Sequence, residues 1–86
     1  MTFYTYMTRN YLNEDSPAGD LAQDMRHEKE TFPRNRSCKF DGWYQLIRSY
    51  LLRKNACMEC LAPFDECWEE YVRCEKKRLN KNLQRQ

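Results

Sequence analysis

The sequence predicts a compact all-α domain of four helices with a long C-terminal helix, and three observations lead to this prediction. Four segments place apolar side chains at the spacing of an amphipathic helix, and start or stop signals bound them. Only 2 glycines and 3 prolines occur, too few for a turn-rich β-sandwich or barrel. The 86 residues suffice for one domain, and 4 Phe, 6 Tyr and 2 Trp residues can fill its core.

The first two predicted helices are separated by a strong start signal. Residues 3–12 form the first helix, because Thr2 is a suitable N-cap and apolar side chains follow at helical spacing. Ser16 and Pro17 then open the second helix, since a hydroxyl caps it and proline occupies the first helical position without losing a hydrogen bond. We expect this helix to end near residues 27–29, ahead of the next proline.

The third and fourth helices carry the longest amphipathic patterns. Asp41 is the expected N-cap of the third helix, and Asn55 is its expected stop. A short cysteine-containing turn should lead to Pro63 at the start of the fourth helix, which opens with acidic and closes with basic residues, as the helix dipole favours. Residues 1–81 are assigned to this single domain, and residues 82–86 to a frayed basic tail.

A predicted core follows from the apolar side of each helix. Its members are Phe3, Met7, Leu21, Met25, Phe32, Leu46, Ile47, Leu51, Phe64, Trp68, Tyr71 and Val72. Removal of a buried aliphatic side chain costs about 2–5 kcal/mol, so Ile47→Ala or Leu51→Ala should destabilise the fold strongly.

Four short motifs stand out in the first three quarters of the chain. They are Phe3-Tyr4-Thr5-Tyr6-Met7, Ser16-Pro17-Ala18-Gly19-Asp20-Leu21-Ala22, Phe32-Pro33-Arg34 and Phe64-Asp65-Glu66-Cys67-Trp68-Glu69-Glu70-Tyr71. In this order and spacing they resemble the YozE family of short bacterial proteins. The resemblance covers residues 3–72 and implies a four-helix fold similar to the sterile alpha motif (SAM), in a family without an established biochemical role. Cys67, where the family tends to have alanine, and the basic extension after Val72 depart from its pattern.

Charge alternates in sign along the chain, although the formal net charge is only +2. Residues 1–30 and 57–72 carry formal charges of −3 and −5, whereas residues 31–56 and 73–86 carry +5 each. Such blocks can steer a charged partner, or they can pair internally between neighbouring helices. Of the two interpretations, internal pairing is the one we prefer.

Five cysteines raise the question of a metal site. Four thiolates that could hold a tetrahedral zinc ion are those of Cys57, Cys60, Cys67 and Cys74. Only one CxxC pair is present, however, and Cys67 and Cys74 lie about 10 Å apart along one predicted helix. We therefore expect no cofactor and a Cys67 that packs as a small apolar side chain, with zinc as the alternative. Disulfides fit poorly with an odd cysteine count in a cytosolic chain, and a redox CxxC would need a βαβ context.

No catalytic arrangement is evident, so we expect a chain that is not an enzyme. His27 is the only histidine, and spacing places no nucleophile or acid beside it. The carboxylates of residues 65–70 fill the first two turns of a predicted helix, which is typical of a solvated face. Gly19 and Gly42 stand alone, so there is no glycine-rich phosphate loop, and no small-molecule substrate is indicated.

Basic side chains are the best candidates for a binding site. One group comprises Arg34, Arg36 and Lys39 in a loop with Arg48, Arg53 and Lys54 on the third helix; a second comprises Lys76, Lys77 and Arg78, followed by Lys81 and Arg85. The loop and helix of the first group could form one patch that contacts nucleic-acid phosphates. Against this, the isoelectric point of about 8.3 is low for a nucleic-acid-binding domain, and the acidic segments would repel phosphates.

We therefore expect a non-enzymatic binding module with a protein partner, and nucleic acid is the alternative. SAM-like folds commonly associate through acidic and basic surfaces of two copies, so the resemblance implies head-to-tail contact, which does not close into a symmetric dimer. Tyr4 and Tyr44 fall outside the apolar stripes and either anchor such an interface or are ordinary, partly exposed tyrosines. No run approaches the roughly 20 apolar residues of a membrane span, so we expect no membrane role and a cytoplasmic location.

Overall fold

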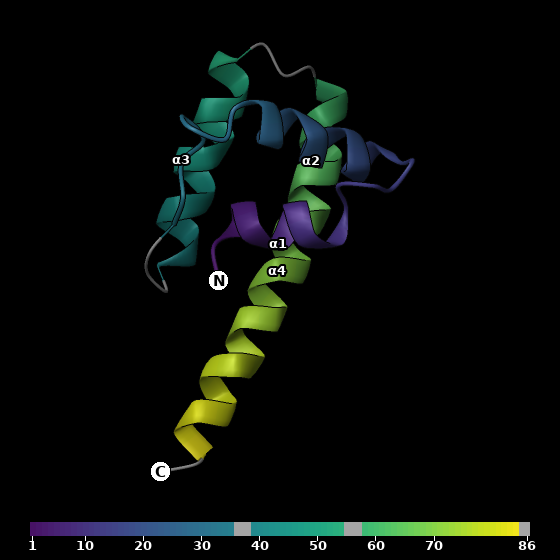
Figure 1. Ribbon diagram of the computed structural model, residues 1–86. Helices are drawn as coiled ribbons and strands as arrows, with labels where there is room; N and C mark the ends of the chain where they lie inside the picture. Colours follow the sequence, from purple (N-terminus) through teal and green to yellow (C-terminus); the bar gives the residue numbers. More distant parts are fainter. Residues whose placement is uncertain (36–38, 55–57, 85–86) are drawn as a thin grey trace.

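The computed structural model describes residues 1–35, 39–54 and 58–84. Within these ranges it contains four helices and no strand, which confirms the predicted all-α fold (Figure 1). The helices are α1 (Phe3–Asn10), α2 (Pro17–His27), α3 (Phe40–Arg53) and α4 (Met58–Gln84). The helices α1, α2 and α3 all pack against α4, and α1 also packs against α2.

Local capping explains where α1 and α2 begin. The Thr2 side chain accepts a hydrogen bond from the backbone N–H of Thr5, and the Ser16 hydroxyl accepts one from Gly19 at 3.1 Å. Pro17 occupies the first turn of α2, as predicted. Helix α1 ends at Asn10, two residues earlier than predicted.

The starts of α3 and α4 differ from the prediction. Helix α3 begins at Phe40 with Lys39 at the N-cap position, so Asp41 lies in the first turn and is not the cap. Helix α4 begins at Met58, and Pro63 lies inside it. Proline favours a helix start because the backbone N–H groups of the first turn make no hydrogen bond within the helix. Pro63 lies one turn further in, where its missing N–H leaves the carbonyl of Glu59 without its helical hydrogen bond. The predicted stop at Asn55 lies outside the described residues.

An aromatic cluster between α1 and α4 forms the centre of the core. The Phe3 ring is fully buried and lies 5.0–5.6 Å from the rings of Phe64, Trp68 and Tyr71 on α4, in tilted or edge-to-face arrangements. Of the predicted core, all members are buried except Leu46 and Val72. Val72 is partly buried against the cluster, whereas Leu46 is 45% exposed because α3 turns only its Ile47 side toward the domain.

A buried asparagine ties the N-terminal segment to α4. Asn35 is 5% exposed, and its Oδ1 accepts a hydrogen bond of 2.9 Å from the backbone N–H of Phe3. Its amide nitrogen donates to the Tyr71 hydroxyl at 2.7 Å, and that hydroxyl donates to the carbonyl oxygen of Met1 at 2.6 Å. The chain after the Phe32-Pro33 pair is thereby fixed against two helices.

The last helix is longer than the packed domain requires. Its 27 residues extend about 40 Å at 1.5 Å per residue, and the longest dimension of the molecule is 44 Å. Figure 1 shows the C-terminal half of α4 projecting away from the other helices. Residues 82–84, expected to fray, belong to this helix. Among the described residues, no helix combines the length and apolarity needed to cross a membrane.

Candidate binding surface

Basic side chains follow one another along α4 where it leaves the domain. All four are exposed, and we call them the basic stretch: Arg73, Lys76, Lys77 and Arg78. Arg78 lies 3.5 Å from a carboxylate oxygen of Glu75, and the same oxygen accepts a 2.8 Å hydrogen bond from the amino group of Met1. Lys76 and Lys77 make no ion pair with any residue in the described ranges. Within the described part of the chain, these two exposed ammonium groups have no carboxylate oxygen within 4 Å.

A groove lies between the first turn of α3 and the middle of α4. It consists of two adjoining hollows of about 430 and 420 Å³, which share Phe40, Asp41 and Lys76. The remaining lining residues are Lys39, Gly42, Trp68, Glu69, Val72 and Arg73. We call this the α3–α4 groove. It brings Lys39 and Lys76, which the sequence assigned to separate basic groups, to one site.

The described members of the first predicted basic group are spread over both ends of α3. Lys39 precedes α3 and Lys54 follows it, and the 14-residue helix between them is about 21 Å long. Lys54 Nζ lies 3.7 Å from a carboxylate oxygen of Glu28, so part of its charge is matched within the chain. Arg53 is exposed at the same end of α3. Arg36 lies outside the described residues.

The two remaining predicted arginines lie beside tyrosines. The guanidinium of Arg34 stands 4.1 Å from the centre of the Tyr4 ring, a cation–π contact worth about 0.5–1 kcal/mol at an exposed site. Tyr44 donates a 2.6 Å hydrogen bond to Asp65, which raises the pKa of Tyr44, and the charge of Arg48 opposes this rise. Both tyrosines are partly buried and pack against the core, which favours their interpretation as ordinary structural residues over interface anchors.

The comparisons with known proteins give one family. A sequence model of the YozE SAM-like fold matches residues 2–73. The chain belongs to this family. No curated protein and no solved structure matches the chain. The YozE SAM-like region ends at Arg73, where α4 begins to leave the domain, so most of the basic stretch lies beyond it.

A carboxylate shared by two tyrosines joins α1 to α4 inside the YozE SAM-like region. One oxygen of Glu70 accepts hydrogen bonds from the hydroxyls of Tyr6 and, at 2.5 Å, of Tyr11. These bonds lower the pKa of Glu70. In return, the bond to Glu70 raises the pKa of Tyr11 to about 12, and burial together with the same carboxylate raises the pKa of Tyr6. No local sequence pattern predicts this cluster, because Glu70 lies 64 residues from Tyr6 and 59 residues from Tyr11.

The described cysteines do not form a metal site. Cys67 is 4% exposed, as its predicted apolar packing requires, and burial followed by the charge of Glu70 raises its pKa to about 11. A thiol with so high a pKa is a weak nucleophile at neutral pH. Cys74 is exposed two turns further along the same helix. No group of three potential metal ligands occurs among the described residues, and the side chains of Cys57 and Cys60 lie outside them.

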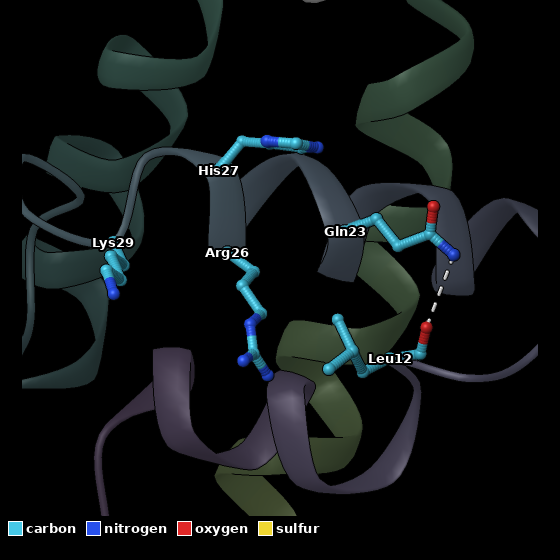
Figure 2. A pocket seen from close by; sticks show the side chains of 5 residues that line it. All are labelled: Leu12, Gln23, Arg26, His27 and Lys29. Carbon is cyan, nitrogen blue, oxygen red and sulfur yellow. Dashed lines mark hydrogen bonds between the residues drawn. The ribbon is translucent and has the colours of Figure 1, made fainter.

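His27 lines a separate, shallow pocket of about 380 Å³ at the end of α2. Figure 2 shows that Arg26 extends toward Leu12 while the His27 ring lies on the opposite side of the α2 ribbon. The amide of Gln23 donates a 3.3 Å hydrogen bond to the carbonyl of Leu12 and closes one side. The residues found to line the pocket include no carboxylate, serine, threonine or cysteine that could work with the histidine.

Proposed function

We propose that the chain is a non-enzymatic protein-interaction module that binds an acidic surface of a partner protein through the basic stretch of α4. The observation that carries this proposal is the exposure of Lys76 and Lys77 on a helix that projects from the domain, with no countercharge within 4 Å among the described residues. A projecting helix is accessible to a partner, and unpaired charges accelerate encounter with an opposite charge.

The distribution of acidic residues favours a protein over nucleic acid as the partner. Asp41 and Glu69 line the groove next to Lys76, and Asp65 and Glu66 are exposed on the preceding turn of α4. A phosphate backbone lying along the basic stretch would approach these carboxylates and be repelled. A folded protein can present its acidic residues only where they meet Lys76 and Lys77.

Affinity capture with charge-reversed variants tests the proposal. We expect Lys76→Glu with Lys77→Glu to lose a bound protein that the unmodified chain retains at low salt and releases at high salt. Arg53→Glu is the control, because Arg53 is also an exposed cation but lies at the C-terminal end of α3, outside the basic stretch. Equal retention by the double variant and the unmodified chain would refute the proposed surface.

Nucleic acid is the second candidate, supported by the same run of exposed cations on one helix. Duplex and single-stranded DNA of mixed sequence, titrated at several salt concentrations, separate the two candidates. Phosphate binding by the basic stretch requires an affinity that falls steeply with salt and a shallower slope in the Lys76→Glu, Lys77→Glu variant. Absence of salt-dependent DNA binding leaves the protein partner.

A further inference from the structure

We propose that the α3–α4 groove is the specificity pocket of this module and accepts a short peptide segment that carries one apolar side chain next to carboxylates. The inference rests on the proposed function, because it assigns the chemistry of the partner segment. Its own basis is different: the hollow between two helices and the mixture of side chains that line it.

The apolar part of the groove has the dimensions of a side-chain pocket. Phe40 and Val72 are partly buried and Trp68 is buried, so the lining exposes apolar edges without a large flat surface. Each hollow has a volume of about 420–430 Å³ and is as open to solvent as the pocket beside His27, which suits one side chain docking at the surface. One leucine-sized side chain entering between α3 and α4 would cover this lining and remove it from water.

The charged residues of the groove determine which polar groups of the peptide can lie beside that apolar side chain. Arg73 and Lys76, two members of the basic stretch, lie one turn apart on α4 and line the groove. Carboxylates that leave the groove toward the C-terminus of α4 would meet Lys77 as well. Asp41 and Glu69 line the same groove and can accept N–H groups of a peptide backbone. A peptide supplies donors and carboxylates together, whereas a nucleic-acid strand supplies phosphates throughout.

Trp68, the largest aromatic residue of the groove lining, offers no free face for base stacking. Trp68 is only 6% exposed, and its ring packs against those of Phe3, Phe64 and Tyr71. Binding of single-stranded nucleic acid normally uses exposed rings on which bases stack. The lining therefore favours a peptide segment over a strand of nucleic acid.

Gly42 makes the groove testable without damage to the fold. A Cβ atom at this position would meet nothing within 4 Å, and Gly42 lies in the first turn of α3 on the groove lining. Gly42→Gln should therefore add a side chain at the rim of the hollow that Gly42 shares with Lys39 and Lys76, while improving the helical propensity of α3. Ser49→Gln is the matched control, because Ser49 is exposed on the same helix but does not line the groove.

The experiment is a titration of the isotopically labelled full chain with a blocked peptide containing one leucine next to a run of glutamates, followed by NMR. We expect amide shifts at Phe40, Gly42 and Val72, and at least about tenfold weaker binding for Gly42→Gln but not for Ser49→Gln. A peptide in which alanine replaces leucine should bind the basic stretch without shifting Phe40.

Three outcomes would overturn the groove assignment. They are shifts confined to Lys77 and Arg78, unchanged affinity in Gly42→Gln, and stronger perturbation of the groove by single-stranded DNA than by the peptide. Failure of the groove is distinguishable from failure of the proposed function. If Gly42→Gln binds like the unmodified chain while Lys76→Glu with Lys77→Glu does not, only the groove is refuted; if both variants bind like it, both proposals are.

Discussion

Gly19 shows how one residue connects the sequence motif of α2 to the packing of the domain. A Cβ atom at this position would lie 1.8 Å from the carbonyl oxygen of Glu14 and 3.1 Å from that of Tyr11. The backbone of the α1–α2 connection therefore rests directly on α2, and the Ser16 hydroxyl caps the helix through the N–H of the same glycine. The short Ser-Pro-x-Gly sequence thus supplies a cap, a helix start and a close contact within four residues.

This contact predicts opposite effects of one substitution at the two glycines. Gly19→Ala should lower the free energy of unfolding by at least about 2 kcal/mol, because the methyl group meets backbone that cannot rotate away. Gly42→Ala should raise it by up to about 1 kcal/mol, because that site is open and alanine favours the helix. Denaturant unfolding of both variants measures the difference. Equal effects would show that the α1–α2 connection can move aside.

The Glu70 cluster predicts how stability depends on pH. Because the folded pKa of Glu70 is lowered, its contribution is present above the unfolded pKa and is lost as pH falls through the folded pKa. Because the pKa of Tyr11 is raised to about 12, the tyrosine contribution is present below its ordinary value of 10.0 and is lost as pH rises toward 12. Stability should therefore decline at both extremes.

Glu70→Gln should flatten both declines and return the Tyr11 titration toward its ordinary pKa. Denaturant unfolding across pH measures the first effect, and ultraviolet titration of the tyrosines measures the second. Glu69→Gln is the control, because it removes an exposed carboxylate from the same helix that accepts no tyrosine hydrogen bond in the described structure. If the unfolding free energy of Glu70→Gln depended on pH as that of the unmodified chain does, the shared carboxylate would not cause the loss of stability at low pH.

At the scale of the helix, α3 separates two neighbouring apolar residues that the sequence could not distinguish. Ile47 is fully buried, whereas Leu46 is 45% exposed. Ile47→Ala should therefore cost about 2–5 kcal/mol of unfolding free energy. Leu46→Ala should change it by less than about 1 kcal/mol. Denaturant unfolding of the two variants tests which side of α3 faces the core; a larger loss for Leu46→Ala would reverse that assignment.

Elements whose signals are local were predictable, and those that depend on packing were not. Thr2 and the Ser16-Pro17 pair cap or open their helices through contacts within three residues, so the starts of α1 and α2 are as predicted. The prediction that α4 starts at Pro63 was wrong, because this proline lies inside a helix that begins at Met58. A packed helix can accommodate a proline beyond its first turn, although one backbone hydrogen bond is lost. Leu46 and Val72 both fit the helical spacing of apolar residues. This spacing does not tell how much of each helix surface the rest of the domain covers.

At the scale of the molecule, the packing of the helices brings separate charge blocks together. An ion pair between Lys54 and Glu28 connects the ends of α3 and α2. The sequence located the basic groups but could not place Lys39 beside Lys76, since that proximity is created by the packing of α3 on α4.

Removal of residues 77–86 should separate the domain from the proposed binding surface. The contacts of Tyr71 and Glu75 with Met1 lie before the cut, so the free energy of unfolding should change by less than about 1 kcal/mol. The groove residues through Lys76 remain, so the leucine-containing peptide should still shift Phe40, but more weakly because Lys77 is absent. Capture of an acidic protein partner should decrease sharply. Unfolding of the shortened chain would instead mean that the projecting helix supports the domain, and undiminished capture would place the partner on the helical domain itself.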